Sequence, residues 1–204
     1  MGLFAGALTA RRFRVVGELP KSGWRDVVRE RLDAFAFREP VGRVGKEEIE
    51  GWVLVQNLLD TSFQDFERWL FDPWVVFALR VDKKALPAKL FRATVEKRCE
   101  AWCRERGVER CPASAKKEIQ ERLEEEWLDR ALPRVALTEI AWNVQTGQVL
   151  VGGLSSSVAE RVRKRFHRTF GLELHPWSPL DGLDDPGLAE RLLGSTPAVF
   201  GGVA

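Results

Sequence analysis

The sequence of 204 residues contains no tyrosine, two histidines, three cysteines and one methionine. Three cysteines cannot all pair within one chain, and this favours a reducing compartment. No apolar run approaches the roughly 18 residues that a membrane-spanning helix needs. The first eight residues have no basic segment before their apolar ones, so we expect no secretory signal and a cytoplasmic location.

The motifs of common hydrolases and kinases are also missing. There is no Gly-x-Ser-x-Gly segment, no glycine-rich phosphate loop and no persuasive acid/base pair. Asp72-Pro73, Asp82 and Lys84 loosely resemble a restriction-type nuclease core, but the Asp-Pro order is reversed and Asp-x-Lys is a very short pattern. We therefore expect a non-enzymatic protein with no catalytic residues and no cofactor.

The net charge of the chain is also small. Lys and Arg number 32 against 30 Asp and Glu, a formal charge of +2, which excludes the bulk cationic excess of a histone-like protein. With 45% apolar and 30% charged residues, the composition is that of an ordinary globular protein. The near-neutral total hides segregation: residues 1–46, 87–117 and 155–170 sum to +5, +5 and +4, whereas 47–86, 118–129 and 171–204 sum to −4, −5 and −4. Such blocks can produce a basic face that a phosphate backbone senses locally.

Hydrophobic periodicity predicts an α+β fold of mixed α/β character, with strand–helix units at both ends and helices between them. The expected elements are an extended segment 3–16, a helix 24–35, a strand 74–81, helices 87–106 and 115–132, strands 138–143 and 148–152 around the turn 145–147, and a helix 157–170. We expect a body over residues 1–180, with 87–132 projecting from it as a helical hairpin. Residues 181–204, rich in Pro, Gly and Asp, are expected to form a peripheral tail.

The helix expected from Ser157, where Ser157 and Glu160 have capping-box spacing, is the clearest candidate binding element. Four cations recur on one side at i, i+3 and i+4 steps with no acid on that face: Arg161, Lys164, Arg165 and Arg168. Val158, Val162 and Phe166 form a separate apolar stripe that can dock on the core. The basic stripe is either a solvated face that keeps the protein soluble or a binding surface.

The acidic block of the second long helix invites a metal or catalytic interpretation; its members are Glu118, Glu121, Glu124, Glu125, Glu126 and Asp129. A metal or catalytic site needs carboxylates that converge from different elements, whereas acidic helix surfaces are usually solvated or paired. We favour pairing with the basic helix that precedes it.

The three cysteines leave two alternatives. Cys99 and Cys103 lie at i, i+4 on one helix face, and Cys111 follows after a turn. A zinc site would need a fourth ligand and usually a tighter Cys-x-x-Cys knuckle, and His167 and His175 are remote in sequence. Packing thiols are the favoured interpretation, and we predict no metal site.

Taken in order, several segments resemble those of the bacterial recombination-associated protein RdgC family over roughly residues 1–180. They are Leu3-Phe4, Gly51-Trp52-Val53, the run Arg80-Val81-Asp82-Lys83-Lys84-Ala85-Leu86-Pro87 before a long helix, Lys116-Lys117 in the charged helical pair, Leu132-Pro133-Arg134, the Trp142 strand with the Gly147 turn, Ser155 to Glu160 before the basic helix, Phe170-Gly171 and Pro176.

The resemblance implies a double-stranded DNA-binding protein without sequence specificity, which forms a ring-shaped homodimer around duplex DNA, is associated with the nucleoid and restrains the RecA recombinase. Lys83, Lys84, Lys116 and Lys117 coincide with basic positions of the family segments. Together with the stripe Arg161, Lys164, Arg165 and Arg168, they are our candidate DNA-binding residues.

Two departures from the family pattern bear on ring closure. Where the family continues Leu-Pro-Arg with Ala-Phe, an aromatic associated with the tip contact, Val135-Ala136 follow Arg134. Family members also continue through a further C-terminal region where this chain ends. These departures leave open an interaction protein that retains the fold and binds a protein partner. A nuclease dependent on Asp82 and Lys84 is a third alternative, and we expect no such activity.

Overall fold

The structure, a computed structural model, describes residues 2–4, 6–40, 45–178, 180, 183 and 185–195, without the side chains of residues 186 and 189. Of the tail expected at 181–204, therefore, only residue 183 and residues 185–195 can be compared with the prediction.

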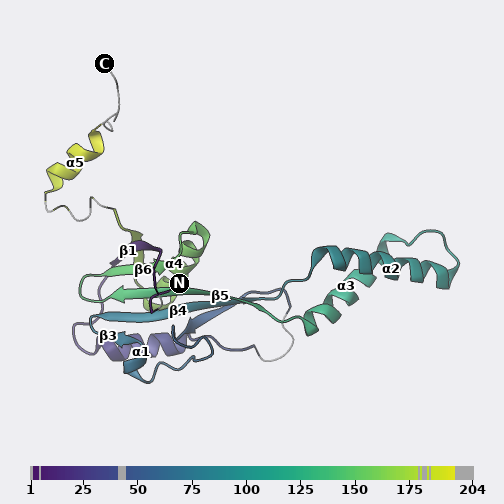
Figure 1. Cartoon of the computed structure of the whole chain (residues 1–204), viewed down its shortest axis with the longest axis horizontal. Coiled ribbons are helices and arrows are strands. Elements are labelled where there is room, and N and C mark those ends of the chain that lie inside the picture. The colour runs from purple at the N-terminus through teal and green to yellow at the C-terminus, as the bar shows by residue number, and fades with distance from the viewer. Residues whose placement is uncertain are drawn as a thin grey trace, which may run out of the picture.

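An antiparallel sheet forms the centre of the molecule (Figure 1). Its strands are β1 Ala10–Val16, β2 Ile49–Val53, β3 Leu70–Phe71, β4 Trp74–Lys83, β5 Arg134–Asn143, β6 Gln148–Gly152 and β7 Glu173–Pro176. The strand order is β2-β4-β5-β6-β1-β7, with β3 pairing with β4 outside this path. The helices are α1 Trp24–Ala34, the 3₁₀ turn η1 Phe66–Arg68, α2 Ala88–Arg106, α3 Ala113–Arg130, α4 Ser156–Phe170 and α5 Pro186–Gly194. This arrangement confirms the α+β class.

The hydrophobic core lies between one face of the sheet and helices α1 and α4. Val75, Phe77 and Leu79 alternate along β4, so that all three side chains enter this core. Trp142 of β5 meets Phe166 of α4 edge-on, with ring centroids 5.2 Å apart. The helix that carries the predicted basic stripe is therefore anchored by its aromatic face.

Gly51 in β2 has a specific packing role. The chain segment after α1 crosses beside β2, where the Phe37 amide donates to the Trp52 carbonyl at 2.8 Å and the Trp52 amide donates to the Phe35 carbonyl at 3.1 Å. A Cβ at residue 51 would overlap the backbone of Phe37. Glycine is thus required for this close approach, which protects an edge of the sheet.

The two long helices lie between β4 and β5 in the chain, and these paired strands keep their register up to Lys83 opposite Arg134. Figure 1 shows α2 and α3 lying beside each other, away from the sheet. Gly107 ends α2 in the left-handed conformation at φ 64°. Phe91 and Trp127 hold the helices together edge-to-face at 5.6 Å between ring centroids, and Val95 and Leu123 are buried between them.

The acidic side chains of α3 pair only in part as expected. Glu126 binds Arg98 of α2 at 2.7 Å, as predicted. Glu118 and Glu121 instead pair within α3, with Arg122 at 2.6 Å and Lys117 at 3.7 Å, and Glu124 binds Lys46 at 2.5 Å. Pairing with the preceding helix was therefore the wrong prediction for these three residues.

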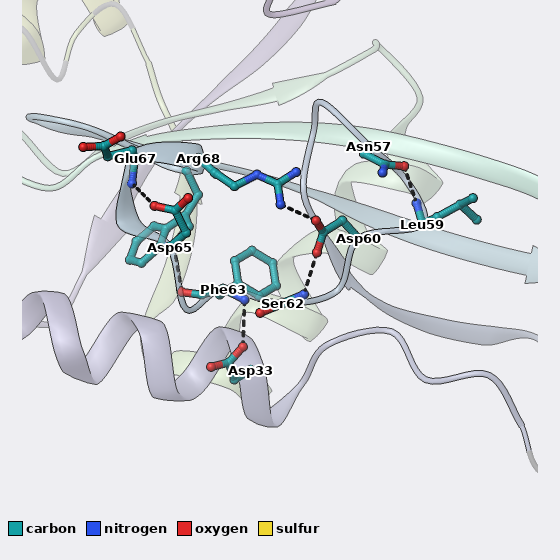
Figure 2. Close-up of polar contacts among 10 residues, drawn as sticks. Asp33, Asn57, Leu59, Asp60, Ser62, Phe63, Asp65, Glu67 and Arg68 are labelled. Carbon is teal, nitrogen blue, oxygen red and sulfur yellow. Dashed lines mark hydrogen bonds and ion pairs between the residues drawn. The ribbon is translucent and has the colours of Figure 1, made fainter.

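The loop between β2 and β4 is held by short-range polar contacts (Figure 2). The Asp60 carboxylate accepts from the Ser62 amide at 3.0 Å and also binds Arg68. The Ser62 amide is the main reason why the pKa of Asp60 lies below its ordinary value. Asp33 of α1 accepts from the Phe63 amide at 2.9 Å, which ties the loop to that helix.

Among the described residues, no helix is both long and apolar enough to cross a membrane.

Candidate nucleic-acid interface

Helix α4 begins two residues before the position that the capping-box spacing indicated. Ser155 is the N-cap, and its hydroxyl accepts from the Val158 amide at 3.5 Å. Glu160 does not reach back to the helix start; it pairs with Arg163 at 2.8 Å. The predicted capping box at Ser157 was thus wrong: the N-cap lies two residues earlier. The buried side chains of the helix are Ala159, Val162, Phe166 and Thr169, so the predicted docking face is confirmed for Val162 and Phe166.

Arg165 is the most deeply placed cation of the stripe, with 11% of its side chain exposed. Its Nη2 donates to the main-chain carbonyls of Phe35 and Glu50, both at 3.1 Å. Its Nη1 lies 3.5 Å from the Glu50 carboxylate, and burial lowers the pKa of the guanidinium below its ordinary value. Arg165 therefore joins α4 to β2 and to the segment after α1.

Arg161 and Lys83 meet on one carboxylate. Arg161 binds one oxygen of Glu48 at 2.7 Å, and Lys83 binds the other at 2.8 Å. The Lys83 hydrogen bond, followed by the charge of Arg161, lowers the pKa of Glu48 below its ordinary value. Two cations that are 78 positions apart in the sequence are thus brought together, with one negative charge between them.

Lys164 and Arg168 are the most accessible cations of the stripe. Lys164 is 75% exposed and lies 3.9 Å from Glu160. Arg168 is exposed and has no ion-pair partner among the described residues. The expectation that no acid lies on this face was wrong, because Glu48, Glu50 and Glu160 each approach one of its cations. The first two come from the region of β2, which helical spacing cannot reveal.

A cleft of about 610 Å³ lies on α4 and is lined by the four cations of the stripe together with Glu50 and Glu160. Arg165 is the anchored member of this lining, and its buried Nε has no hydrogen-bond partner among the described residues. His167 and Ser157 also line the cleft. Clustered N–H donors with this charge are suited to contact phosphate oxygens without reading base sequence.

The remaining candidate residues lie elsewhere. Lys84 donates to the main-chain carbonyl of Leu128 in α3 at 2.6 Å, so it ties the helical pair to the end of β4. Lys116 and Lys117 are exposed near the start of α3, which lies at the end of the helical pair away from the sheet (Figure 1). The structure therefore joins Lys83 to the α4 stripe but separates Lys84, Lys116 and Lys117 from it.

The residues of the loose nuclease pattern are all engaged in structural contacts. Arg80 holds Asp82 through two hydrogen bonds of 2.9 and 2.7 Å, and the two side chains are 8% and 7% exposed. Asp72 binds Arg25 at 2.9 Å. Arg80 also stacks on Phe37 at 4.1 Å from the ring centroid. Arg80 was not among the predicted site residues, although its i, i+2 spacing from Asp82 is the signal for such a cross-linked pair on one face of a strand.

The cysteines lie near one another where α2 meets α3. Cys99 and Cys111 line the same cleft, together with Lys116, and all three thiols are free. Burial is the main reason why the pKa values of Cys99 and Cys103 lie above the ordinary thiol value. Within the described ranges, no group of three or more His, Cys, Asp or Glu side chains has the geometry to hold a metal ion.

Comparison with protein families gives one match. The family model described as "Putative exonuclease, RdgC" covers residues 19–185 of this chain. No curated protein matches the chain. The matched range contains every strand except β1, the helical pair and the basic helix α4. Because the model covers well over half of the sequence, the chain belongs to the RdgC family.

Proposed function

We propose that this protein binds double-stranded DNA without sequence preference, through phosphate contacts centred on α4. The observation that carries the proposal is the group of cations Arg161, Lys164 and Arg168, which lines one cleft on a helix fixed to the core. Nonspecific binding needs local positive potential rather than a large net charge. A formal charge of +2 over the whole chain is compatible with this local surface.

Each cation has a different role in the proposed interface. Arg168 is exposed, and Lys164 is 75% exposed with only a 3.9 Å contact to Glu160, so both can pair directly with phosphates. Arg161 and Lys83 share Glu48, so a phosphate must compete with that carboxylate for them. Arg165 is a positioning residue, because its Nη1 and Nη2 both bind Glu50 in β2 and Nη2 also binds the Phe35 carbonyl. Lys116 and Lys117 provide a second, separate contact on the helical pair, and Lys84 positions that pair.

The family membership supports further parts of the proposal: a projecting helical hairpin, a homodimer that closes a ring around duplex DNA, and restraint of RecA-dependent recombination at the nucleoid. We propose these as the assembly and role of this chain. A ring would raise occupancy by placing two α4 surfaces on one duplex, so that modest individual contacts combine.

We further propose that the protein is not an enzyme, although the family description includes the word exonuclease. The supporting observation is the Arg80–Asp82 pair, which occupies both carboxylate oxygens that a nuclease would need for a metal ion. Lys84 is likewise held by the Leu128 carbonyl.

The experiment is a titration of the full chain against unrelated duplexes of equal length over a series of salt concentrations. The proposal is supported if all duplexes bind with equal affinity and the logarithm of the binding constant falls linearly with the logarithm of the salt concentration. Undetectable binding at low salt, or a flat salt response, refutes it.

A second candidate function is a protein-binding adaptor of the same fold. It is favoured by exposed apolar side chains just before β5 and in the first half of that strand. They are Leu132, Val135 and Leu137, which are 88%, 44% and 43% exposed. Purification from native cells with and without nuclease treatment separates the two candidates. Companions that survive digestion of DNA support the adaptor, whereas their loss supports the DNA-binding protein.

A further inference from the structure

A second cleft shares none of its described lining residues with the α4 cleft. Its volume is about 640 Å³, which falls within the usual size range of small-molecule sites, about 300–1,000 Å³. The β1–α1 connection, the start of α1 and the β5–β6 turn form its walls.

The floor of this cleft contains an unsatisfied donor. Trp142 lines the cleft and is 2% exposed, and its buried indole Nε1 has no hydrogen-bond partner among the residues that the structure describes. Buried N–H groups are normally paired, because an unpaired one has lost its hydrogen bonds to water without gaining another. Phe166 and Phe170 pack against the ring at centroid distances of 5.2 and 5.3 Å. Because Trp142 also lines the cleft, a ligand bound there is the candidate source of the missing acceptor.

The rim of the cleft favours an anion. Helix α1 begins there with no side-chain cap, so its first amides are available as donors. Arg14 and Lys21 are exposed on the rim and have no ion-pair partner in the part of the chain that the structure describes. Arg25 is already bound to Asp72 at 2.9 Å, which leaves Glu18 as the one lining carboxylate without such a partner among the described residues.

The wall between floor and rim is apolar and aromatic. Trp24 is partly buried against the core and lines the cleft beside Leu19 and Leu172. An indole of this kind can stack on a planar heterocycle. The cleft thus combines an aromatic wall, a hydrogen-bond donor at its floor and cations with helix amides at its rim.

We propose that this cleft binds a nucleoside monophosphate, either free or as the 5′-phosphorylated end of a DNA strand. The phosphate lies at the start of α1 between Arg14 and Lys21. The base packs against Trp24, and one of its acceptor atoms receives the Trp142 indole N–H. This site is distinct from the α4 surface and does not depend on duplex binding there.

The test follows the indole N–H resonance of Trp142 in the ¹⁵N-labelled full chain, assigned by through-bond NMR, during titration with deoxyadenosine monophosphate. We expect this resonance to shift and saturate while that of Trp177 does not move. Arg14→Ala with Lys21→Ala should raise the concentration for half-maximal shift by about tenfold or more, because two charge-assisted contacts are lost. Arg12→Ala, on the same strand but outside the cleft lining, is the matched control and should leave the titration unchanged.

Deoxyadenosine and inorganic phosphate are the negative arms. An unchanged Trp142 resonance with deoxyadenosine monophosphate overturns the proposal. So does a shift with deoxyadenosine or with inorganic phosphate that equals the shift with the nucleotide. A double variant that responds to the nucleotide as the wild type does also overturns it. A 5′-phosphorylated single-stranded oligonucleotide identifies the source. A response at lower concentration than with the mononucleotide supports a strand end, and a response to the mononucleotide alone supports a free ligand.

Discussion

Arg165 of α4 donates to the main-chain carbonyl of Glu50 in β2 at 3.1 Å. The contact joins two elements that are 115 positions apart in the chain. Helical spacing assigned Arg165 to a DNA-facing stripe, but this residue also holds the helix against the sheet. Its neighbours Lys164 and Arg168, one residue before it and three after it, remain available to solvent.

Replacing Arg165 with Ala should lower the free energy of unfolding by about 2–3 kcal/mol, because it leaves two part-buried carbonyls without their charged donor. Urea denaturation followed by circular dichroism measures this loss. Lys164→Ala is the matched control, since it removes an exposed cation from the same helix and should change stability by at most about 0.5 kcal/mol. Equal stabilities for the two variants would contradict the structural role of Arg165.

Replacing Glu48 with Gln should strengthen DNA binding, because it releases Arg161 and Lys83 from their shared carboxylate. With about one more cation free for phosphate, the slope of log K against log salt should become steeper by about 0.9. Glu47→Gln is the control: it makes the same charge change at an exposed neighbour with no ion-pair partner among the described residues. If both variants strengthen binding equally, general charge rather than the Glu48 contacts explains the gain.

The Glu48 carboxylate should also make the stability of the fold depend on pH. Lys83 and Arg161 lower the pKa of Glu48 in the folded state from its ordinary value of 4.5. A carboxyl group with a lowered folded-state pKa stabilises the protein fully above its unfolded pKa, and this contribution disappears as the pH falls through the folded value. Thermal unfolding from pH 6 to pH 3 should therefore show the wild type losing stability relative to Glu48→Gln below about pH 4.5. A difference that stays constant over this range would exclude the linkage.

Replacing Asp82 with Asn should destabilise the fold by about 3–5 kcal/mol, because it leaves the buried Arg80 guanidinium without its counter-charge. The measurement is the denaturation midpoint.

Incubation of the wild type with labelled DNA and Mg²⁺ or Mn²⁺ should in addition yield no cleavage products. Metal-dependent cleavage that Asp82→Asn abolishes, with stability retained, would establish the nuclease that we argue against.

The long, periodic elements were predictable from sequence because their local signals agree with their packing. The strand at Trp74 and the helices at Ala88, Ala113 and Ser156 begin within two residues of the expected positions. The short strands β2, β3 and β7 were not predicted as strands. β3 and β7 have only two and four residues, which carry too little periodicity, and β2 contains Gly51, a residue type that is depleted in strands. The extended segment expected from Leu3 becomes a strand only from Ala10, where β6 and β7 provide partners.

The candidate site was predictable only in part. Spacing within α4 identified its cations and its docking face. The acids that neutralise Arg161 and Arg165 lie more than 110 positions earlier in the chain, and only the tertiary fold brings Glu48 and Glu50 to them. The role of Lys84 likewise depends on the carbonyl of Leu128, which no sequence pattern marks.

The most direct test of the central claim compares the salt dependence of duplex binding between the wild type and the Lys164→Ala, Arg168→Ala double variant. Removing two phosphate contacts should weaken binding to every duplex alike and make the slope of log K against log salt shallower by about 1.8. Unchanged stability of the double variant confirms that the fold is intact. An identical slope for both proteins would contradict phosphate binding by α4.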